Sequence, residues 1–275
     1  MEQETLNRLK KTAAQIRLDI IEEVHAASSG HPGGSLSIAD IITYLYFQEM
    51  KVDPKNPNDP DRDRLVLSKG HTAPALYAAL AEKGYFPTEE LKKLRQVDSF
   101  LQGHPDMKGT PGVDMSTGSL GLGFSCACGM ALAAKIDGKD YRTYTIIGDG
   151  ESEEGQIWEA AMFAAHYKLD NLCAVIDLNG LQIDGTVTEV MNPTPRDKKL
   201  EAFGFHVITI DGHDFDQIAA AFDEAKTVKG KPCAIIAHTI KGKGVSFMEN
   251  QVGWHGSAPN DEQYATAISE IKATM

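Results

Sequence analysis

Residues 143–180 read TYTIIGDGESEEGQIWEAAMFAAHYKLDNLCAVIDLNG, a segment with the pattern of a strand, a helix and a second strand. Residues 143–147 and 172–177 are apolar and rich in β-branched side chains, as is typical of buried strands. Between them, residues 153–167 have the composition and spacing of a helix. A strand, a helix and a second strand at this spacing predict a right-handed crossover that makes the two strands parallel.

The same alternation continues on both sides of this unit. Further strands are expected at 64–67, 206–210 and 234–238, and further helices at 4–27, 37–47, 73–83 and 215–226. The Pro- and Asp-rich segment 51–64 is expected to be a surface loop. We find no linker, so we expect residues 1–275 to form one α/β domain, a parallel sheet with helices on both faces.

Composition excludes several classes of protein. The chain is 42% hydrophobic and 24% charged, with a formal net charge of −12. This charge argues against non-specific binding to nucleic acid or to an anionic membrane, but not against a phosphorylated substrate. The charged N-terminus is unlike a signal peptide, and no stretch resembles a membrane span. The four cysteines have neither zinc-ligand nor disulfide spacing, so we expect free thiols and a cytoplasmic protein.

Two polar side chains follow the strands of the opening unit. Asp149 comes after the first strand and Asn179 after the second. Because ligands bind beyond the carboxyl ends of parallel strands, both oxygens can reach one point, where they suit Mg²⁺ or Ca²⁺ rather than Zn²⁺. Gly148 and Gly150 let the backbone approach an anion closely. The alternative is that Gly-Asp-Gly and Leu-Asn-Gly are only turn sequences.

Residues 148–180 resemble the thiamine diphosphate signature, a Gly-Asp-Gly followed about thirty residues later by an asparagine. Five further stretches occur in the order found in transketolases, and together they cover nearly the whole chain: SSGHPGGSLSIADI at 28–41, RLVLSKGHTAPALYAAL at 64–80, QGHPD at 102–106, STGSLGLGFSCACGMALA at 116–133 and KGKGVSFMENQVGWHG at 241–256. The resemblance implies the diphosphate-binding domain of the thiamine diphosphate-binding fold. It also implies thiamine diphosphate and Mg²⁺ as cofactors, with Ca²⁺ or Mn²⁺ as substitutes.

The resemblance also assigns binding residues. By similarity, the metal ligands are Asp149, Asn179 and the carbonyl of Leu181. The residues expected to contact the cofactor are Lys69, His71, Gly118, Ser119, Leu120, Gly150, Ile183, Lys241 and His255. Some relatives have Pro where Ser119 stands, so only backbone and shape are expected to matter there.

Histidine suits proton transfer near neutral pH, and four histidines occupy family-matching loops. We expect His31 and His104 to hold donor hydroxyls, and His71 and His255 to serve the cofactor and proton transfer. Glu154 matches a family glutamate that faces the paired subunit, but it also reads as a first-turn carboxylate favoured by the helix dipole. Gly34 departs from relatives that place a substrate-contacting serine there.

Transketolases transfer a two-carbon ketol unit from a ketose phosphate to an aldose phosphate. The full-length enzymes also have a pyrimidine-binding domain and a C-terminal domain, which supply a catalytic glutamate and the arginines for sugar phosphates. The sequence ends at Met275 without a segment for these domains. We therefore expect a separate partner subunit to supply them, in a heterotetramer of two copies of each chain.

Three other readings stay open. The chain is also compatible with half of another thiamine diphosphate enzyme, such as a deoxyxylulose-phosphate synthase or a transketolase for unusual sugars. A non-catalytic binding subunit would retain the same pocket. A dinucleotide-binding dehydrogenase fits poorly, because the glycines in residues 118–123 do not have the spacing of that fingerprint.

Overall fold

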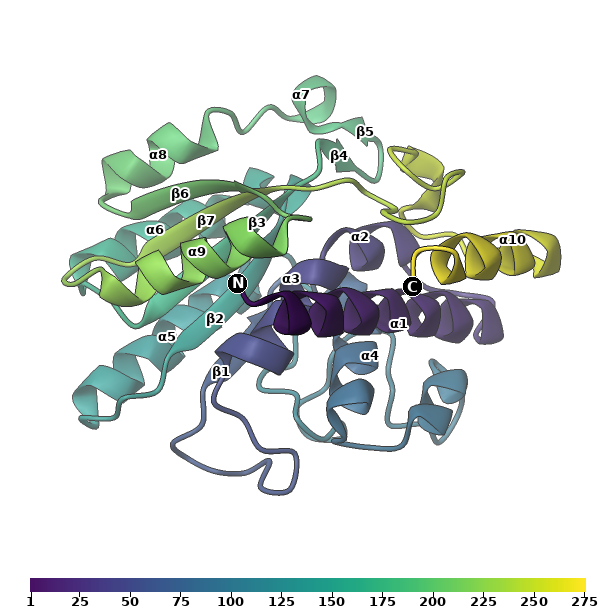
Figure 1. The fold of residues 1–275 in the computed structure, drawn as a ribbon. Helices are drawn as coiled ribbons and strands as arrows, with labels where there is room; N and C mark the ends of the chain where they lie inside the picture. Colours follow the sequence, from purple (N-terminus) through teal and green to yellow (C-terminus); the bar gives the residue numbers. More distant parts are fainter.

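The computed structural model describes residues 1–275, and its centre is a parallel sheet of five strands (Figure 1). The strand order is β1-β2-β3-β7-β6. The strands are β1 (Arg64–Leu67), β2 (Thr143–Gly148), β3 (Leu172–Leu178), β7 (Cys233–His238) and β6 (His206–Asp211). Each lies within one residue of the strand predicted from the sequence, so the predicted fold class is confirmed.

Helices cover both faces of this sheet (Figure 1). They are α1 (Gln3–Ala26), α2 (Pro32–Ser37), α3 (Ala39–Tyr44), α4 (Ala73–Lys83), α5 (Leu122–Ile136), α6 (Gly155–His166), α7 (Val187–Val190), α8 (Arg196–Phe203), α9 (Phe215–Thr227) and α10 (Asp261–Lys272). Short 3₁₀ turns lie at Gly70–Thr72, Thr88–Lys93, Gly150–Glu153 and Val252–Trp254. No helix combines the length with the apolar composition that a membrane span requires.

Alternate side chains of each strand enter two separate cores, as the pleat requires. On β2, Tyr144 and Ile146 pack in the larger core with helices α1, α3, α4 and α9. Ile147 faces the other way and packs with α5, α6 and α8. All four cysteines are free thiols, as expected, and three of them are buried in these cores. Burial on both faces explains why the strands are continuously apolar.

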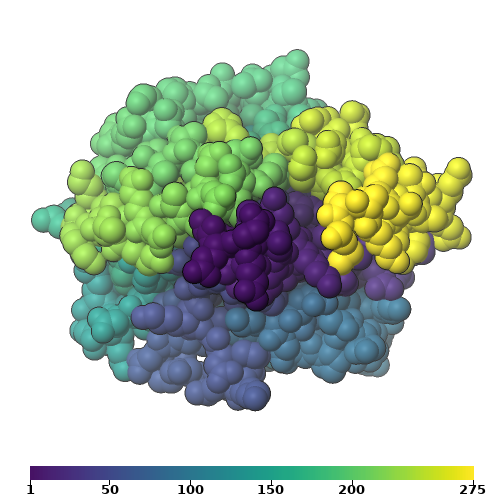
Figure 2. All heavy atoms as spheres, in the orientation of Figure 1, coloured from purple at the N-terminus to yellow at the C-terminus, as the bar shows by residue number.

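The two ends of the chain lie on the same side of the molecule. Helix α10 packs along α1, and both are visible on one face (Figures 1 and 2). A capping box between Asn260 and Gln263 fixes the start of α10. The segment between β7 and α10 carries Lys241 and His255, both of which lie beyond the carboxyl end of β7.

The single helix expected at 37–47 is wrong. The chain already turns helical at Pro32, breaks at Ile38 and ends in a π turn at Leu45–Glu49. Pro32 occupies the first helical position, where its fixed φ angle favours a helix start. Ser37 is the last residue of α2, and its hydroxyl contacts the Gly34 carbonyl at 3.0 Å and Asp177 at 2.7 Å.

The segment between β3 and β6 contains structure that the sequence did not reveal. Two short antiparallel strands, β4 (Leu181–Gln182) and β5 (Gly185–Thr186), form a hairpin directly after Asn179. Helices α7 and α8 follow, and α8 packs beside α6 and β6. The hairpin places Leu181 and Ile183 over the carboxyl ends of β2 and β3.

We expect Ile146→Ala to lower the free energy of unfolding by about 2–5 kcal/mol, because it leaves a cavity in the larger core. Ile146 is 0% exposed in the centre of the sheet. Ile136→Ala is the matched control, since Ile136 is 74% exposed at the end of α5. Chemical denaturation measures both changes, and an equal loss from the two variants would contradict this packing.

Candidate active site

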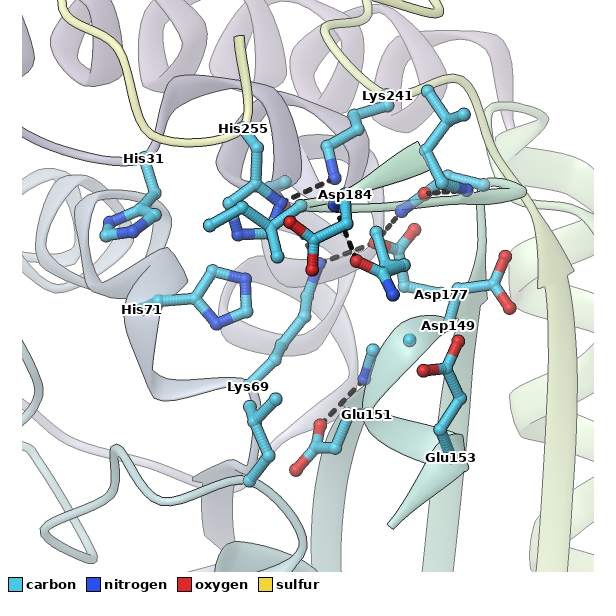
Figure 3. A pocket seen from close by; sticks show the side chains of 18 of the residues that line it. His31, Lys69, His71, Asp149, Glu151, Glu153, Asp177, Asp184, Lys241 and His255 are labelled. Atoms are coloured by element: carbon cyan, nitrogen blue, oxygen red, sulfur yellow. Dashed lines mark hydrogen bonds and ion pairs between the residues drawn. The ribbon is translucent and has the colours of Figure 1, made fainter. Parts of the chain in front are cut away.

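A pocket of about 360 Å³ lies at the carboxyl ends of the central strands (Figure 3). Thirteen of the residues predicted for the site line it: His31, Lys69, His71, Gly118, Leu120, Asp149, Gly150, Glu154, Asn179, Leu181, Ile183, Lys241 and His255. Two predicted residues, His104 and Ser119, do not line the pocket. His104 lies beside it, because a Cβ added to Gly118 would stand 3.2 Å from the His104 ring.

The ends of β2 and β3 bring Asp149 and Asn179 together. Gly148 pairs with Asp177 in the sheet, so the residues that follow each strand enter the same region. Asp149 Oδ2 accepts the backbone N–H of Gly180, next to Asn179. Asn179 Oδ1 accepts the N–H of Leu181 at 3.1 Å. The two predicted ligands are therefore neighbours, as the crossover geometry predicts.

These residues fit a hard divalent cation. Asp149 Oδ1 is buried, and its contact is an ion pair with the Arg196 guanidinium. A buried carboxylate is stable only when a cation or a proton compensates its charge, so this side chain is suited to hold a cation. Burial raises the pKa of Asp149, and Arg196 opposes that rise. Carboxylate, amide and carbonyl oxygens are the ligands that Mg²⁺ and Ca²⁺ prefer.

Two glycines allow close packing of the chain around the pocket. A Cβ added to Gly150 would stand 2.6 Å from the Cβ of Gln182, so only glycine allows the β2 loop to approach the hairpin this closely. A Cβ on Gly34 would stand 2.8 Å from Thr72 Cγ2, and 3.8 Å from both Lys69 Nζ and His71 Nε2. The residue that departs from some relatives is thus closely packed beside two predicted cofactor contacts.

Asp177 is a site residue that the sequence analysis missed. It is fully buried and forms an ion pair of 2.5 Å with Lys69. Asn179 Nδ2 donates to the same carboxylate at 2.8 Å, and the hydroxyls of Ser37 and Thr239 also donate to it. Burial alone would raise the pKa of Asp177, but Lys69 and these donors hold it below its ordinary value. The sequence signal that could have identified Asp177 is its position as the one acidic residue in the apolar strand LCAVIDL.

Lys241 is buried without a carboxylate partner. Its ammonium group is 2.9 Å from His255 Nδ1, and it takes part in no ion pair. Burial, together with the charge of Lys69, lowers the pKa of Lys241 to about 8. A buried ammonium that lacks a counter-ion suits an anion with several oxygens, such as a diphosphate.

Three histidines form a cluster at the mouth of the pocket (Figure 3). The ring centroids of His31, His71 and His255 are 5.0–5.6 Å apart. Burial is the main cause that lowers the pKa of His31 to about 4 and that of His255 to about 3, and it also lowers the pKa of His71. All three imidazoles are therefore neutral at pH 7, able both to donate and to accept a hydrogen bond.

Glu151 connects three parts of the pocket wall. The sequence analysis did not identify this residue. Its carboxylate accepts the Ser68 hydroxyl at 2.5 Å, the Gly121 N–H at 2.9 Å and the Gly148 N–H at 2.8 Å. Burial raises the pKa of Glu151. Glu154, in contrast, is exposed at the pocket edge, and its backbone precedes the first residue of α6.

Known proteins resemble this chain over nearly its full length. Residues 9–272 match the family described as transketolase, thiamine diphosphate binding domain. The 6-deoxy-6-sulfo-D-fructose transketolase subunit SqwG of Clostridium sp. (strain MSTE9) is 52% identical, covering 96% of each chain. An apulose-4-phosphate transketolase subunit from Phocaeicola vulgatus is 45% identical, covering 93% of this chain and 90% of its own.

Longer transketolases match in sequence and in structure. Human transketolase is 43% identical over 98% of this chain, which spans 43% of that protein. The crystal structure of transketolase from Campylobacter jejuni is 37% identical, with a TM-score of 0.91 over 96% of this chain and 42% of that one. The chain therefore belongs to the transketolase family, as its thiamine diphosphate-binding domain.

Proposed function

We propose that this chain is the thiamine diphosphate-binding subunit of a two-subunit transketolase. The observation that carries the proposal is the pocket, which combines a metal-suited oxygen set with two buried lysines at the carboxyl ends of the strands. Two relatives named as transketolase subunits support the division into two chains, because this chain covers 96% and 90% of their lengths. The partner subunit would supply the pyrimidine-binding domain, in an assembly of two copies of each chain.

In this proposal the oxygens of Asp149 and Asn179 and the carbonyl of Leu181 hold the divalent cation. Lys69 and Lys241 offer positive charge to the diphosphate group. Bound thiamine diphosphate supplies an electron sink for the cleavage of a ketose carbon–carbon bond. Asp177 holds Lys69 in position through their buried ion pair, so the lysine cannot swing away when the pocket fills.

The histidines perform the proton transfers and bind the sugar. Lys241 donates to His255 Nδ1, so Nε2 of the neutral ring carries the proton and can donate it. His71 stacks beside His255 with a centroid distance of 5.0 Å, which allows a proton to be passed between neighbouring neutral rings through a hydroxyl or water. His31 and His104 hold donor hydroxyls, and their neutral rings act as both donors and acceptors toward them.

We propose a specialised ketose as substrate, with a terminal phosphate or sulfonate. The names of the two relatives refer to a sulfonated sugar and to a sugar phosphate. Arg95 adds a cation near the predicted sugar-binding histidines: its guanidinium donates to the Ser29 hydroxyl at 2.6 Å and lies 3.4 Å from His31 Nδ1. A cation beside the sugar-binding histidines favours an anionic substrate over a neutral one.

Reconstitution tests the proposal. We expect the chain mixed with its partner, thiamine diphosphate and Mg²⁺ to transfer a ketol unit, and either chain by itself to be inactive. Donors to compare are xylulose 5-phosphate, 6-deoxy-6-sulfofructose and apulose 4-phosphate, and one of the latter two should give the highest kcat/KM. Turnover by this chain without its partner would refute the two-subunit reading. No transfer from any donor would refute the transketolase activity.

Cofactor binding should also take up a proton near pH 8. Because the pKa of Lys241 is lowered to about 8, roughly half of these side chains are neutral at that pH, and a bound diphosphate restores the charge. Calorimetric titration with thiamine diphosphate and Mg²⁺, in buffers of different ionisation enthalpy, measures the uptake. It should disappear at pH 6, where Lys241 is already protonated.

Lys241→Met should remove this uptake. Lys243→Met is the control, because Lys243 lies in the same loop, where it pairs with Glu249. An equal uptake at pH 8 in the parent and in Lys241→Met would show that another group takes up the proton.

A further inference from the structure

Arg196, the first residue of α8, is a buried cation in contact with the proposed metal ligand. It is 5% exposed, and its guanidinium pairs with Asp149 Oδ1. Its Nε also donates to the Ser152 hydroxyl at 2.8 Å, and that hydroxyl donates to the Asp149 carbonyl at 2.5 Å. The side chain otherwise borders an apolar hollow lined by Phe124, Ile147, Trp158 and neighbouring residues. A guanidinium is buried in such surroundings only when a carboxylate compensates its charge.

The Asp149 carboxylate therefore faces two cations. It lines the pocket on one side, where the proposed divalent cation would bind, and it contacts Arg196 on the other. Its Oδ1 is in direct ion-pair contact with the Arg196 guanidinium, so a divalent cation at Asp149 must bind beside this charge or displace it. Two positive charges at one buried carboxylate repel each other strongly, because the protein interior screens charge poorly.

Glu153 offers Arg196 a second partner. It lies four residues after Asp149, at the end of the 3₁₀ turn Gly150–Glu153, and lines the same pocket. Its Oε1 is buried and has no hydrogen-bond partner. Figure 3 shows Glu153 below Asp149 on one side of the pocket. Asp149 and Glu153 are the two carboxylates whose charges act most on Arg196.

We propose that Arg196 is an exchangeable counter-ion of the metal ligand. It pairs with Asp149 in the metal-free protein and moves to Glu153 when a divalent cation takes Asp149. Arg196 is thus a positioning residue that keeps a buried carboxylate paired and sets the cation concentration at which the site fills. This inference rests on the proposed function, because it needs Asp149 to be a metal ligand.

The exchange predicts opposite effects for two substitutions. Arg196→Met removes the competing charge and leaves Asp149 unpaired, so cation binding becomes tighter while the metal-free protein becomes less stable. Glu153→Gln removes the second partner of Arg196. The arginine then stays paired with Asp149 and competes with the cation, so the affinity for the cation falls. In the double variant Arg196→Met/Glu153→Gln, the effect of Glu153→Gln should be lost, because the arginine on which it acts is gone.

Binding of Mn²⁺ in the presence of thiamine diphosphate tests this scheme without any measurement of activity. Free Mn²⁺ is quantified by electron paramagnetic resonance, with the full chain in complex with its partner subunit. We expect Arg196→Met to lower the Kd for Mn²⁺ by about tenfold and Glu153→Gln to raise it about threefold. Lys198→Met is the matched control: it removes the same charge from α8, but its side chain is 65% exposed and pairs with Glu201. Its Kd should equal that of the parent.

Several outcomes would overturn the inference. A Kd for Arg196→Met that is equal to or above the parent value would make Arg196 a purely structural partner of Asp149. If Arg196→Met does not fold, the Glu153→Gln variant tests the exchange instead. An unchanged Kd for Mn²⁺ in that variant would exclude the exchange. Additive effects in the double variant would exclude it too. Failure of the parent complex to bind Mn²⁺ with thiamine diphosphate would instead refute the proposed function, and this inference with it.

Discussion

The parallel, in-register pairing of β2 with β3 is the constraint on which the site depends. It sets Gly148 opposite Asp177, so the Gly-Asp-Gly loop and the Asn179 loop leave the sheet side by side. Because side chains alternate between the faces of a strand, a slip of one residue would move Asp177 out of reach of Lys69 and separate Asp149 from Gly180. Burial of both faces of these strands fixes the register.

Buried charged side chains lie around the carboxyl ends of β2 and β3 and determine which ligand the pocket can bind. Lys69 compensates the charge of Asp177, and Arg196 compensates the charge of Asp149. Lys241 forms no ion pair, and its ammonium group contacts the neutral ring of His255. The pocket thus contains an ammonium group without a carboxylate partner, beside the oxygen ligands of Asp149 and Asn179. A divalent cation with a diphosphate suits both, since the metal binds the oxygens and the diphosphate compensates the ammonium.

Much of the fold and of the pocket could be predicted from the sequence, because the strands and the site loops are indicated by the types and spacing of neighbouring residues. The apolar β-branched strands and the Gly-Asp-Gly and Leu-Asn-Gly turns follow from residue type and spacing, and His31, His71 and His255 lie in the predicted pocket. Glu151 and Arg196 were missed, since their partners Gly121 and Asp149 are 30 and 47 positions away and depend on tertiary packing. The single helix expected at 37–47 was wrong because Pro32 already starts a helix and the chain breaks at Ile38, within the predicted helix.

Whether Asp149 and Asn179 hold the cation and the diphosphate together is tested by comparing Asp149→Ala and Asn179→Ala with the parent. Calorimetry of thiamine diphosphate and Mg²⁺ binding to the complex with the partner subunit gives the affinities, and Asp184→Ala, an exposed residue of the same pocket, is the control. We expect a loss of affinity of about a hundredfold in the first two variants and little change in the control. Parent-like affinity in both would show that the cation and the diphosphate are held elsewhere.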